Sequence, residues 1–310
     1  MSDGSSVDSE VGEGGAWKRQ TSAFRNWVEP DSEQFPAESG RYHLYVSLAC
    51  PWAHRAIITR KLKGLEEAIS LSVVDPIRDE KGWAFRDVPG ASRDPVNDFR
   101  YLSEAYLATK RGFEARVTVP VLWDKQECRI VNNESADVIV MLDQAFGEHA
   151  NASIELYPEE LREEMDELNE FVYDTVNDGV YKCGFAGTQG AYAQAYEKLF
   201  DALGRLDQRL GNRRYLMGER ITLADVRLFT TLVRFDTVYY VHFKCSGARI
   251  VDYQNLWGWT RDLFQTPGVA DTVNMDHIKR HYYVTHTSLN PKRIVPLGPE
   301  PDFGTPHGRH

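Results

Sequence analysis

The residue of this 310-residue chain best placed for chemistry is Cys50, which Pro51 follows directly. Before it, apolar and polar residues alternate from Tyr42 to Leu48, which predicts a strand. After it, Pro51 suits a first helical turn and the stretch to Leu62 holds neither Gly nor Pro, which predicts a helix. Cys50 therefore falls at the start of a helix. Unpaired backbone N–H groups and the helix dipole favour the thiolate there, and the thiolate is the reactive form.

The alternative is that Cys50 is a small buried apolar residue, as most free cysteines are. The corner between strand and helix argues against this, and Arg55, one turn into the helix, can add positive charge. The fourth position of the motif is Ala53 rather than a second cysteine. A lone thiolate cannot form an internal disulfide there, so it would form a mixed disulfide with a small thiol and be released by a second one.

Two further stretches have features that suit ligand binding. Residues 116–123 read as an apolar strand, yet Pro120 cannot donate to a sheet ladder. A cis peptide bond before Pro120 at the start of the strand would resolve the conflict and turn the neighbouring backbone outward. The polar cluster 132–137 opens a helix whose free N–H groups and hydroxyl suit a carboxylate. An ordinary N-cap by Ser135 or Asn133 is the alternative.

A strand–helix–strand unit positions these residues. Gly64 ends the first helix and residues 69–74 form a second strand, which predicts a parallel pair with a right-handed crossover. The long polar insertion 75–112 follows, and its aromatic residues favour a lid or pocket wall. A hairpin turn at 124–126 then leads to a returning strand at 128–131.

Residues 159 to about 266 show apolar residues at helical spacing throughout. The stretch 192–210 is amphipathic and Gly211 ends it. Thr222, with Asp225 three residues later, predicts a capping box that starts a buried helix. We therefore expect an all-helical bundle in this part of the chain.

The predicted fold class is α/β plus all-α. An N-terminal arm covers residues 1–38, and an α/β domain covers residues 39–147. A linker containing Gly, Asn, Ser and Pro leads to the all-helical domain at 158–270. Residues 271–310 form a C-terminal tail.

The composition narrows the classes of function. The formal net charge is −10 without a block of Lys and Arg, which speaks against a nucleic-acid partner or an anionic membrane surface. No apolar run approaches the roughly 20 residues that span a bilayer. The first fifteen residues are acidic, rich in Ser and Gly and unlike a signal peptide, so we interpret them as a disordered arm.

The remaining cysteines and histidines carry weaker signals. Four widely separated cysteines show no disulfide framework, which suits a reducing cytosol and predicts a cytoplasmic protein. His277 and His281 are four apart and suit one helix face. As a zinc pair they lack an acidic third ligand at fixed spacing, so we expect no metal.

Five stretches in one order give the chain a specific resemblance. A strand-Cys-Pro-helix corner, a Val-Pro strand, a Glu-Ser helix start and an all-helical second domain together resemble a glutathione transferase with a thioredoxin-like first domain. In detail the chain is similar to the glutathionyl-hydroquinone reductases, the Xi class of glutathione transferases, from about Trp17 to Arg309. The stretches that carry this similarity are residues 42–55, 116–124, 133–135, 173–182 and 242–245.

The resemblance implies which residues bind glutathione. Trp83 in the insertion matches a glutathione-contacting tryptophan. Arg116 and Val119 match the strand before the cis-proline, where the Val119 backbone pairs with the tripeptide. Glu134 and Ser135 match the residues that hold its γ-glutamyl end, so for this helix start the resemblance favours a binding site over a plain cap.

The resemblance also implies a reaction. Cys50 matches a catalytic cysteine, and Tyr181 and Tyr282 match tyrosines that line a quinone pocket, with the tail packed on the active site. The implied activity is reduction of glutathionyl-hydroquinones to hydroquinones through a Cys50–glutathione mixed disulfide, with release of glutathione disulfide. Glutathione is the implied co-substrate, and a homodimer is the implied assembly.

Three other functions remain open at this point. One is an omega-like thiol transferase or dehydroascorbate reductase that uses Cys50 but turns over aryl thioethers poorly. Another is a non-enzymatic ligand-binding module in which Cys50 is incidental. A conjugating transferase is less expected, because conjugation needs a Ser or Tyr hydroxyl at the corner where Cys50 stands.

Overall fold

The structure is a computed structural model that describes residues 12–309. The chain divides into two compact units. The first unit contains Gln20–Glu155 and Asp271–His286, and the second contains Leu156–Ala270 together with residues 12–19 and 287–309. Of the predicted N-terminal arm, residues 1–11 lie outside the described residues, and the rest divides between the two units.

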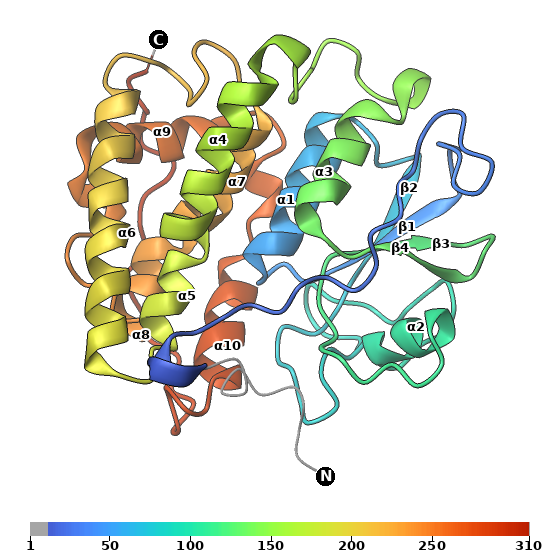
Figure 1. The fold of residues 1–310 in the computed structure, drawn as a ribbon, viewed down its shortest axis with the longest axis horizontal. Coiled ribbons are helices and arrows are strands. Elements are labelled where there is room, and N and C mark those ends of the chain that lie inside the picture. Colours follow the sequence, from blue (N-terminus) through green and yellow to red (C-terminus); the bar gives the residue numbers. More distant parts are fainter. Residues whose placement is uncertain (1–11, 310) are drawn as a thin grey trace. The chain divides into compact units, whose positions relative to one another are not determined.

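Within the described residues, the first unit is built on a four-stranded sheet with the order β2-β1-β3-β4. The strands are β1 (Tyr42–Val46), β2 (Ile69–Val73), β3 (Val121–Asp124) and β4 (Arg129–Asn132). β1 runs parallel to β2 and antiparallel to β3, and β3 and β4 form the predicted hairpin (Figure 1). The predicted parallel strand–helix–strand unit is therefore confirmed. Every side chain of β1 and β3 is buried, which places the core on both faces of these central strands.

The strand predicted at 116–123 is shorter than expected and begins only at Val121. The peptide bond between Val119 and Pro120 is cis, as predicted. Upstream of it, the backbone N–H groups are used by side chains: Arg116 N donates to Gln20 Oε1 (3.3 Å) and Thr118 N to Tyr106 Oη (3.1 Å). Because Pro120 has no N–H and its neighbours donate elsewhere, the ladder cannot extend into this stretch.

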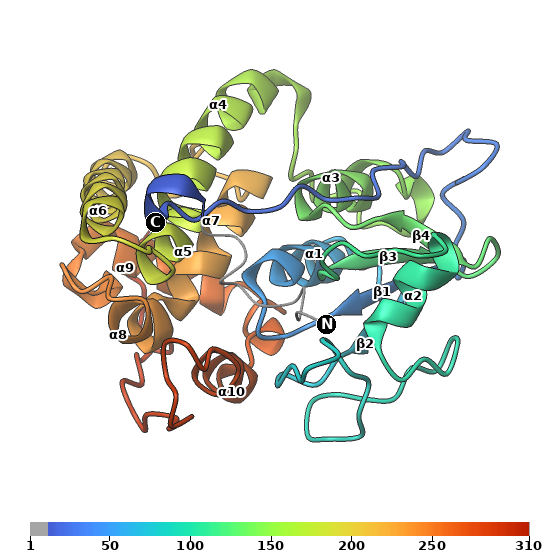
Figure 2. The same cartoon turned by 60° about the horizontal axis from the view of Figure 1, so that its bottom comes forward.

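Two helices pack side by side in the first unit, α1 (Pro51–Leu62) and α3 (Ser135–Gln144), as Figure 2 shows. The bounds of α1 match the prediction, and Gly64 follows its end with a positive φ of 65°. The insertion contains a helix that we did not predict, α2 (Leu102–Thr109). It contacts β4, where Ile130 N donates to Thr109 Oγ1 (2.8 Å).

The predicted tail returns to the first unit as helix α10 (Met275–Thr285), capped by the side chain of Asn274.

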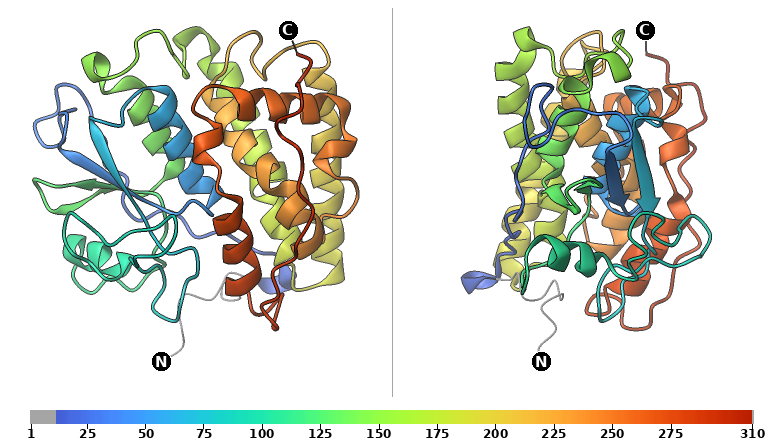
Figure 3. Two further views of the ribbon diagram at one scale, coloured as in Figure 1. Left: turned by 180° about the vertical axis from the view of Figure 1, so that it is seen from behind. Right: turned by 90° about the vertical axis from the view of Figure 1, so that its right-hand side faces the viewer.

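The second unit is helical. Its helices are α4 (Arg162–Val172), α5 (Gly179–Gly184), α6 (Gln189–Leu210), α7 (Leu223–Arg234), α8 (Tyr240–His242) and α9 (Gln254–Gln265). α6 packs against α5 and α9 (Figure 3).

The helix predicted at 192–210 begins three residues earlier, because the Thr188 hydroxyl accepts from Ala191 N and caps it. The capping box of α7 is confirmed, with Asp225 Oδ2 accepting from both the N–H and the hydroxyl of Thr222 at 2.9 Å. Two segments wind as π-helix, Tyr173–Asn177 and Phe235–Tyr239. Within the described part of the chain, none of the helices combines the length and the apolar composition that a membrane crossing needs.

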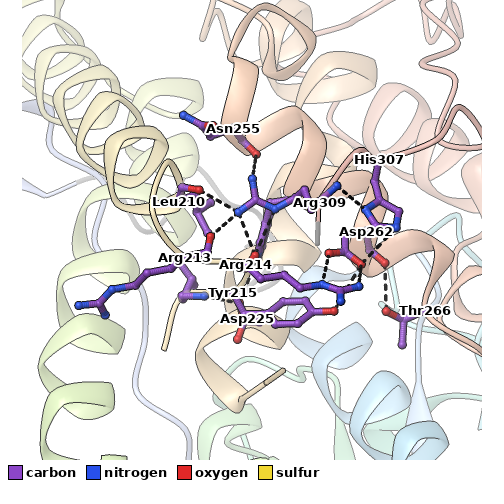
Figure 4. Close-up of polar contacts among 12 residues, drawn as sticks. Leu210, Arg213, Arg214, Tyr215, Asp225, Asn255, Asp262, Thr266, His307 and Arg309 are labelled. Carbon is purple, nitrogen blue, oxygen red and sulfur yellow. Dashed lines mark hydrogen bonds and ion pairs between the residues drawn. The ribbon is translucent and has the colours of Figure 1, made fainter. Parts of the chain in front are cut away.

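Arg309 anchors the end of the described chain to the rest of the second unit (Figure 4). Its guanidinium donates to the carbonyls of Leu210 (2.8 Å) and Arg214 (3.0 Å), at and just beyond the end of α6. Arg214 in turn donates twice to the buried carboxylate of Asp262 in α9 (2.9 and 3.1 Å). The last carbonyls of a helix lack intrahelical partners, so a guanidinium there satisfies groups that burial would leave unpaired.

A buried imidazole lies at the centre of the sheet. His43 of β1 pairs in register with Ser70 of β2, and its Nδ1 lies 2.7 Å from Ser70 Oγ. Its Nε2 is buried and has no hydrogen-bond partner among the described residues. Burial, with smaller contributions from the positive charges of Lys125 and Arg60, lowers the pKa of His43 from 6.5 to about 4.

This pKa predicts a specific loss of stability in acid. Between pH 6.5 and 4 the unfolded chain takes up a proton on His43 that the folded chain does not, so stability falls as the pH falls through this range. The wild type should lose about 3 kcal/mol more than a His43→Asn variant between pH 7 and pH 4. Urea unfolding at each pH, followed by circular dichroism, measures the difference, and equal losses in both proteins would contradict the prediction.

Candidate active site

The Cys50 thiol lies at the first turn of α1 and against the backbone of a distant segment. Cys50 is the N-cap residue of α1, and that first turn contains no acidic side chain. The thiol is half-buried, with its Sγ 3.8 Å from the carbonyl oxygen of Val119. The sulfur therefore lies beside the carbonyl of the Val119–Pro120 peptide bond and at the positive end of helix α1. This arrangement suits a nucleophilic sulfur beside a backbone that lies outside the sheet ladder and can pair with a peptide ligand.

Arg55, which the sequence suggested as a source of charge for Cys50, reaches the start of α3. Its guanidinium lies 4.5 Å from the ring centroid of Trp52, and its Nη1 donates to Ser135 Oγ (3.4 Å). The side chain is fully buried, so solvent screens its positive charge little and neighbouring groups experience it strongly. Arg55 thereby ties the helix that carries Cys50 to the helix start that carries Ser135.

The start of α3 is capped by a residue that neither reading of the sequence named. The N-cap residue is Glu134, whose Oε1 accepts from Ala136 N (3.1 Å), so the alternative of a cap by Ser135 or Asn133 was wrong. Glu134 Oε2 also accepts from the hydroxyl of Ser22 (2.8 Å). Because the Glu134 carboxylate caps the helix, the Ser135 hydroxyl does not serve as the cap. It lies between Arg55, from which it accepts, and Glu134, to which it donates.

A buried tyrosine that sequence reasoning missed joins the two backbone segments of the site. Tyr106 Oη donates to the Thr118 carbonyl (2.8 Å) and accepts from Thr118 N and from Asn133 Nδ2, both at 3.1 Å. Burial raises the pKa of Tyr106 and so keeps the phenol neutral as a donor. The hydroxyl therefore holds the residue before Val119 beside the residue before Glu134. The sequence showed Tyr106 only as one of several aromatic residues in the polar insertion, and this gave no sign of its hydrogen bonds.

Trp83 is buried within the insertion, and its position is determined on several sides. Its carbonyl accepts from Leu102 N (2.9 Å) at the start of α2. Its indole stacks on the imidazole of His281 in α10, with centroids 5.0 Å apart and an interplanar angle of 19°. Arg78 places its guanidinium carbon 5.5 Å from the Trp83 ring centroid. The insertion is therefore an ordered part of the first unit at this residue.

The other predicted site residues are distributed over both units. Arg116 is half-buried, directly before the stretch that leads to Val119. Tyr282 lies in α10 of the first unit, where its buried ring packs edge-on against His281 and His286. Tyr181 belongs to the second unit. The first unit thus brings Cys50 to Val119 directly and to the start of α3 through Arg55.

Tyr181 lies in an aromatic cluster on α5. It stacks on Trp17 at 5.5 Å and lies edge-on to Phe243 at 5.3 Å, with Tyr239 at 6.1 Å. The phenol is only half-buried, whereas Tyr239 and Phe243 are fully buried. Such a cluster suits an aromatic ligand, because ring contacts add to the energy of apolar burial.

The histidine pair of the tail does not form a metal site with other side chains. His277 and His281 lie on α10, and each imidazole contacts a backbone carbonyl, that of Pro89 and of Pro76 respectively. Among residues 12–309 there is no group of three or more His, Cys, Asp or Glu side chains that could hold a metal ion.

Comparisons with known proteins agree on one family. The family models of the glutathione S-transferase N-terminal domain and C-terminal domain match residues 49–145 and 189–262. The chain is 52% identical to the glutathionyl-hydroquinone reductase YqjG of Escherichia coli, over 96% of this chain and 93% of that protein. It is 47% identical to the glutathionyl-hydroquinone reductase PcpF of Sphingobium chlorophenolicum, over 92% of this chain and 90% of that one.

Solved structures support the same relationship. The glutathione-bound structure of YqjG superposes with a TM-score of 0.90 and covers 92% of this chain and 96% of that one, at 53% identity. A Xi-class glutathione transferase from Natrialba magadii superposes with a TM-score of 0.92 and 52% identity, over 94% of this chain and 90% of that one.

The network around Tyr106 predicts a measurable loss of stability. Tyr106→Phe removes the hydroxyl and leaves the half-buried carbonyl and N–H of Thr118 without this partner. We expect the free energy of unfolding to fall by about 1–3 kcal/mol, measured by urea unfolding. Tyr157→Phe is the control, because it removes a solvent-exposed bond to Asp166 and should change stability by less than about 0.5 kcal/mol. Equal effects of the two substitutions would show that the buried network contributes nothing specific.

Proposed function

The chain belongs to the glutathionyl-hydroquinone reductases, the Xi class of glutathione transferases, and from this membership we propose that it reduces glutathionyl-hydroquinones to hydroquinones. Glutathione is the co-substrate, and the substrate is a small glutathione conjugate. The observation that carries the proposal is the position of Cys50 Sγ at the start of α1, 3.8 Å from the carbonyl of Val119.

In this proposal the glutathionyl part binds along the first unit. Its backbone pairs with that of Val119, which the sheet leaves outside its ladder. A ligand carboxylate beside the Glu134 carboxylate would be repelled, so Glu134 accepts a hydrogen bond from the ammonium group of the γ-glutamyl end. Ser135 and the N–H groups at the start of α3 receive its carboxylate. Trp83 and Arg116 complete the binding site from the insertion and the segment before Val119.

The first chemical step forms a disulfide and breaks a carbon–sulfur bond. The Cys50 thiolate attacks the sulfur of the aryl thioether, and the bond from sulfur to the ring carbon breaks. Before this attack the ring tautomerises to a ketone, which places a proton on the carbon that bears the sulfur. The electron pair of the broken bond then passes into the ring as an enolate, and the enolate oxygen takes up a proton. The products are a hydroquinone and a Cys50–glutathione mixed disulfide.

Two tyrosines are assigned to the ring oxygen in this mechanism. Tyr181 and Tyr282 donate hydrogen bonds to the ketone oxygen and pass the proton that tautomerisation and cleavage require. The aromatic cluster around Tyr181 supports its role, since a quinone ring gains contacts with such side chains.

The second step regenerates the thiol. A second glutathione thiolate attacks the glutathione sulfur of the mixed disulfide, and the Cys50 thiolate leaves. The second product is glutathione disulfide, so two glutathione sulfurs are oxidised for each ring carbon reduced. The two half-reactions predict ping-pong kinetics.

Three further assignments belong to the proposal. We place the protein in the cytoplasm as a homodimer, and all four cysteines are free thiols, as a reducing compartment maintains them. The predicted domains 39–147 and 158–270 are assigned as the thioredoxin-like and helical glutathione-transferase domains. The contact of α10 with Trp83 supports a tail, 271–310, that packs on the active site.

Replacement of the nucleophile tests the reaction. With a glutathionyl-hydroquinone and excess glutathione, the wild type should release hydroquinone, measured by chromatography. Cys50→Ser should lower this turnover by about three orders of magnitude or more, because a serine hydroxyl cannot form the mixed disulfide. Cys128→Ser is the matched control, because this exposed thiol lies in the β3–β4 turn and should be dispensable.

Mass spectrometry of the same proteins separates the alternatives. A folded wild type that acquires one glutathione on Cys50 but releases no hydroquinone would favour omega-like thiol transfer. A wild type with neither turnover nor adduct would leave only a ligand-binding module.

A further inference from the structure

Helix α10 presents one of its histidines to the glutathione-site tryptophan. The imidazole of His281 stacks on the Trp83 indole with centroids 5.0 Å apart and an angle of 19° between the planes. Both side chains are buried, at 7% and 5% exposure, so neither ring is free to reorient. The contact joins the insertion to a helix that follows the whole helical unit in the sequence.

The His281 ring is itself held in place by a hydrogen bond. Its Nδ1 lies 2.7 Å from the carbonyl oxygen of Pro76, 205 residues away in the chain. A carbonyl only accepts, so Nδ1 carries the proton and donates. This bond sets the rotation of the ring, and the ring plane in turn sets the plane on which the Trp83 indole lies.

A second histidine of α10 makes a similar contact without touching Trp83. His277 lies one turn earlier, and its Nε2 is 2.8 Å from the carbonyl oxygen of Pro89. The adjacent Gly90 has a φ of +80°, and a Cβ there would come within 2.6 Å of His277 Nε2. The insertion is therefore fitted closely to α10 at two places, of which only the His281 contact involves the ligand-binding ring.

We propose that His281 is a positioning residue that holds the Trp83 indole in the orientation in which it contacts glutathione. This inference rests on the proposed function, since it requires Trp83 to contact glutathione. In this role His281 acts through Trp83 and not by its own contact with glutathione. Its stack on Trp83 makes glutathione affinity depend on α10. The next residue of this helix, Tyr282, packs edge-on against His281 and is assigned to the quinone. One helix thus supports both halves of the substrate.

Two substitutions at His281 separate its ring from its hydrogen bond. His281→Asn keeps a donor near the position of Nδ1 but removes the stacked ring. His281→Phe keeps the ring but loses the bond to Pro76. We expect His281→Asn to raise the KM for glutathione about tenfold with kcat changed by less than about twofold, because it removes one aromatic contact from the binding residue. His281→Phe should stay within about threefold of the wild-type KM.

The matched control is His277→Gln, which keeps a donor for the Pro89 carbonyl on the same helix and leaves Trp83 untouched. It should retain the wild-type KM. Circular dichroism establishes that each variant is folded. Should His281→Asn fail to fold, His281→Leu removes the ring with an apolar side chain that suits the buried site, and the same tenfold change is expected.

A double-substitution cycle distinguishes positioning from a general structural effect. The Kd of glutathione is measured by calorimetry in the Cys50→Ser background, where no turnover occurs. Trp83→Leu should weaken binding, and adding His281→Asn to it should weaken binding no further, because His281 acts through Trp83. Independent, additive effects of the two substitutions would overturn the proposal, as would a wild-type KM in folded His281→Asn or a tenfold loss in His281→Phe.

The outcome at Trp83 alone separates this inference from the proposed function. Wild-type glutathione affinity in Trp83→Leu would overturn the inference, because Trp83 would then not be a glutathione contact. The reaction at Cys50 is read separately by hydroquinone release. A wild type that releases no hydroquinone would refute the proposed function whatever the binding data show.

Discussion

The missing N–H group of Pro120 is the constraint on which the rest of the site depends. A strand that contains proline cannot pair there, so β3 begins at Val121 and the residues before it lie outside the sheet. Their backbone groups then need other partners, and Tyr106 supplies them for Thr118. The Val119 carbonyl is left facing the Cys50 sulfur at 3.8 Å, so this one break in the sheet brings a backbone outside the ladder next to the thiol.

Around this break, buried polar side chains connect elements that are far apart in the chain. Arg55 joins α1 to α3, and Tyr106 joins the insertion to the segments before β3 and α3. Each such group loses hydration on burial and is stable only because its partner is present. Arg55 and Tyr106 therefore fix the site residues more firmly than apolar packing would, since a hydrogen bond has a direction as well as a distance.

The first unit depends on a segment that follows Leu156–Ala270 of the second unit in the sequence. The chain leaves the first unit after Glu155 and comes back at Asp271. α10 then buries His281 against Trp83 and bonds to two carbonyls of the insertion. The insertion is also bonded to the sheet, where Ser92 N donates to the Val73 carbonyl at the end of β2, so its conformation depends on both β2 and α10.

The sequence by itself determined the features that depend on neighbours within one or two turns. Pro51 after Cys50 marked the start of α1, Gly64 its end, and Thr222 with Asp225 the start of α7. The alternating pattern from Tyr42 marked β1, and the conflict at Pro120 indicated the cis bond. Long motifs in a specific order were enough to indicate the family, which the comparisons confirm.

The tertiary structure alone decided which distant residues meet. α2 was hidden in a polar insertion, Glu134 rather than its neighbours caps α3, and Tyr106 links two backbone segments. The stack of His281 on Trp83 has no signal in either local sequence. Local rules depend on dihedral preferences and spacing over a few residues. Contacts such as this one depend on how whole elements pack, and packing is settled only when buried groups from all of them are satisfied together.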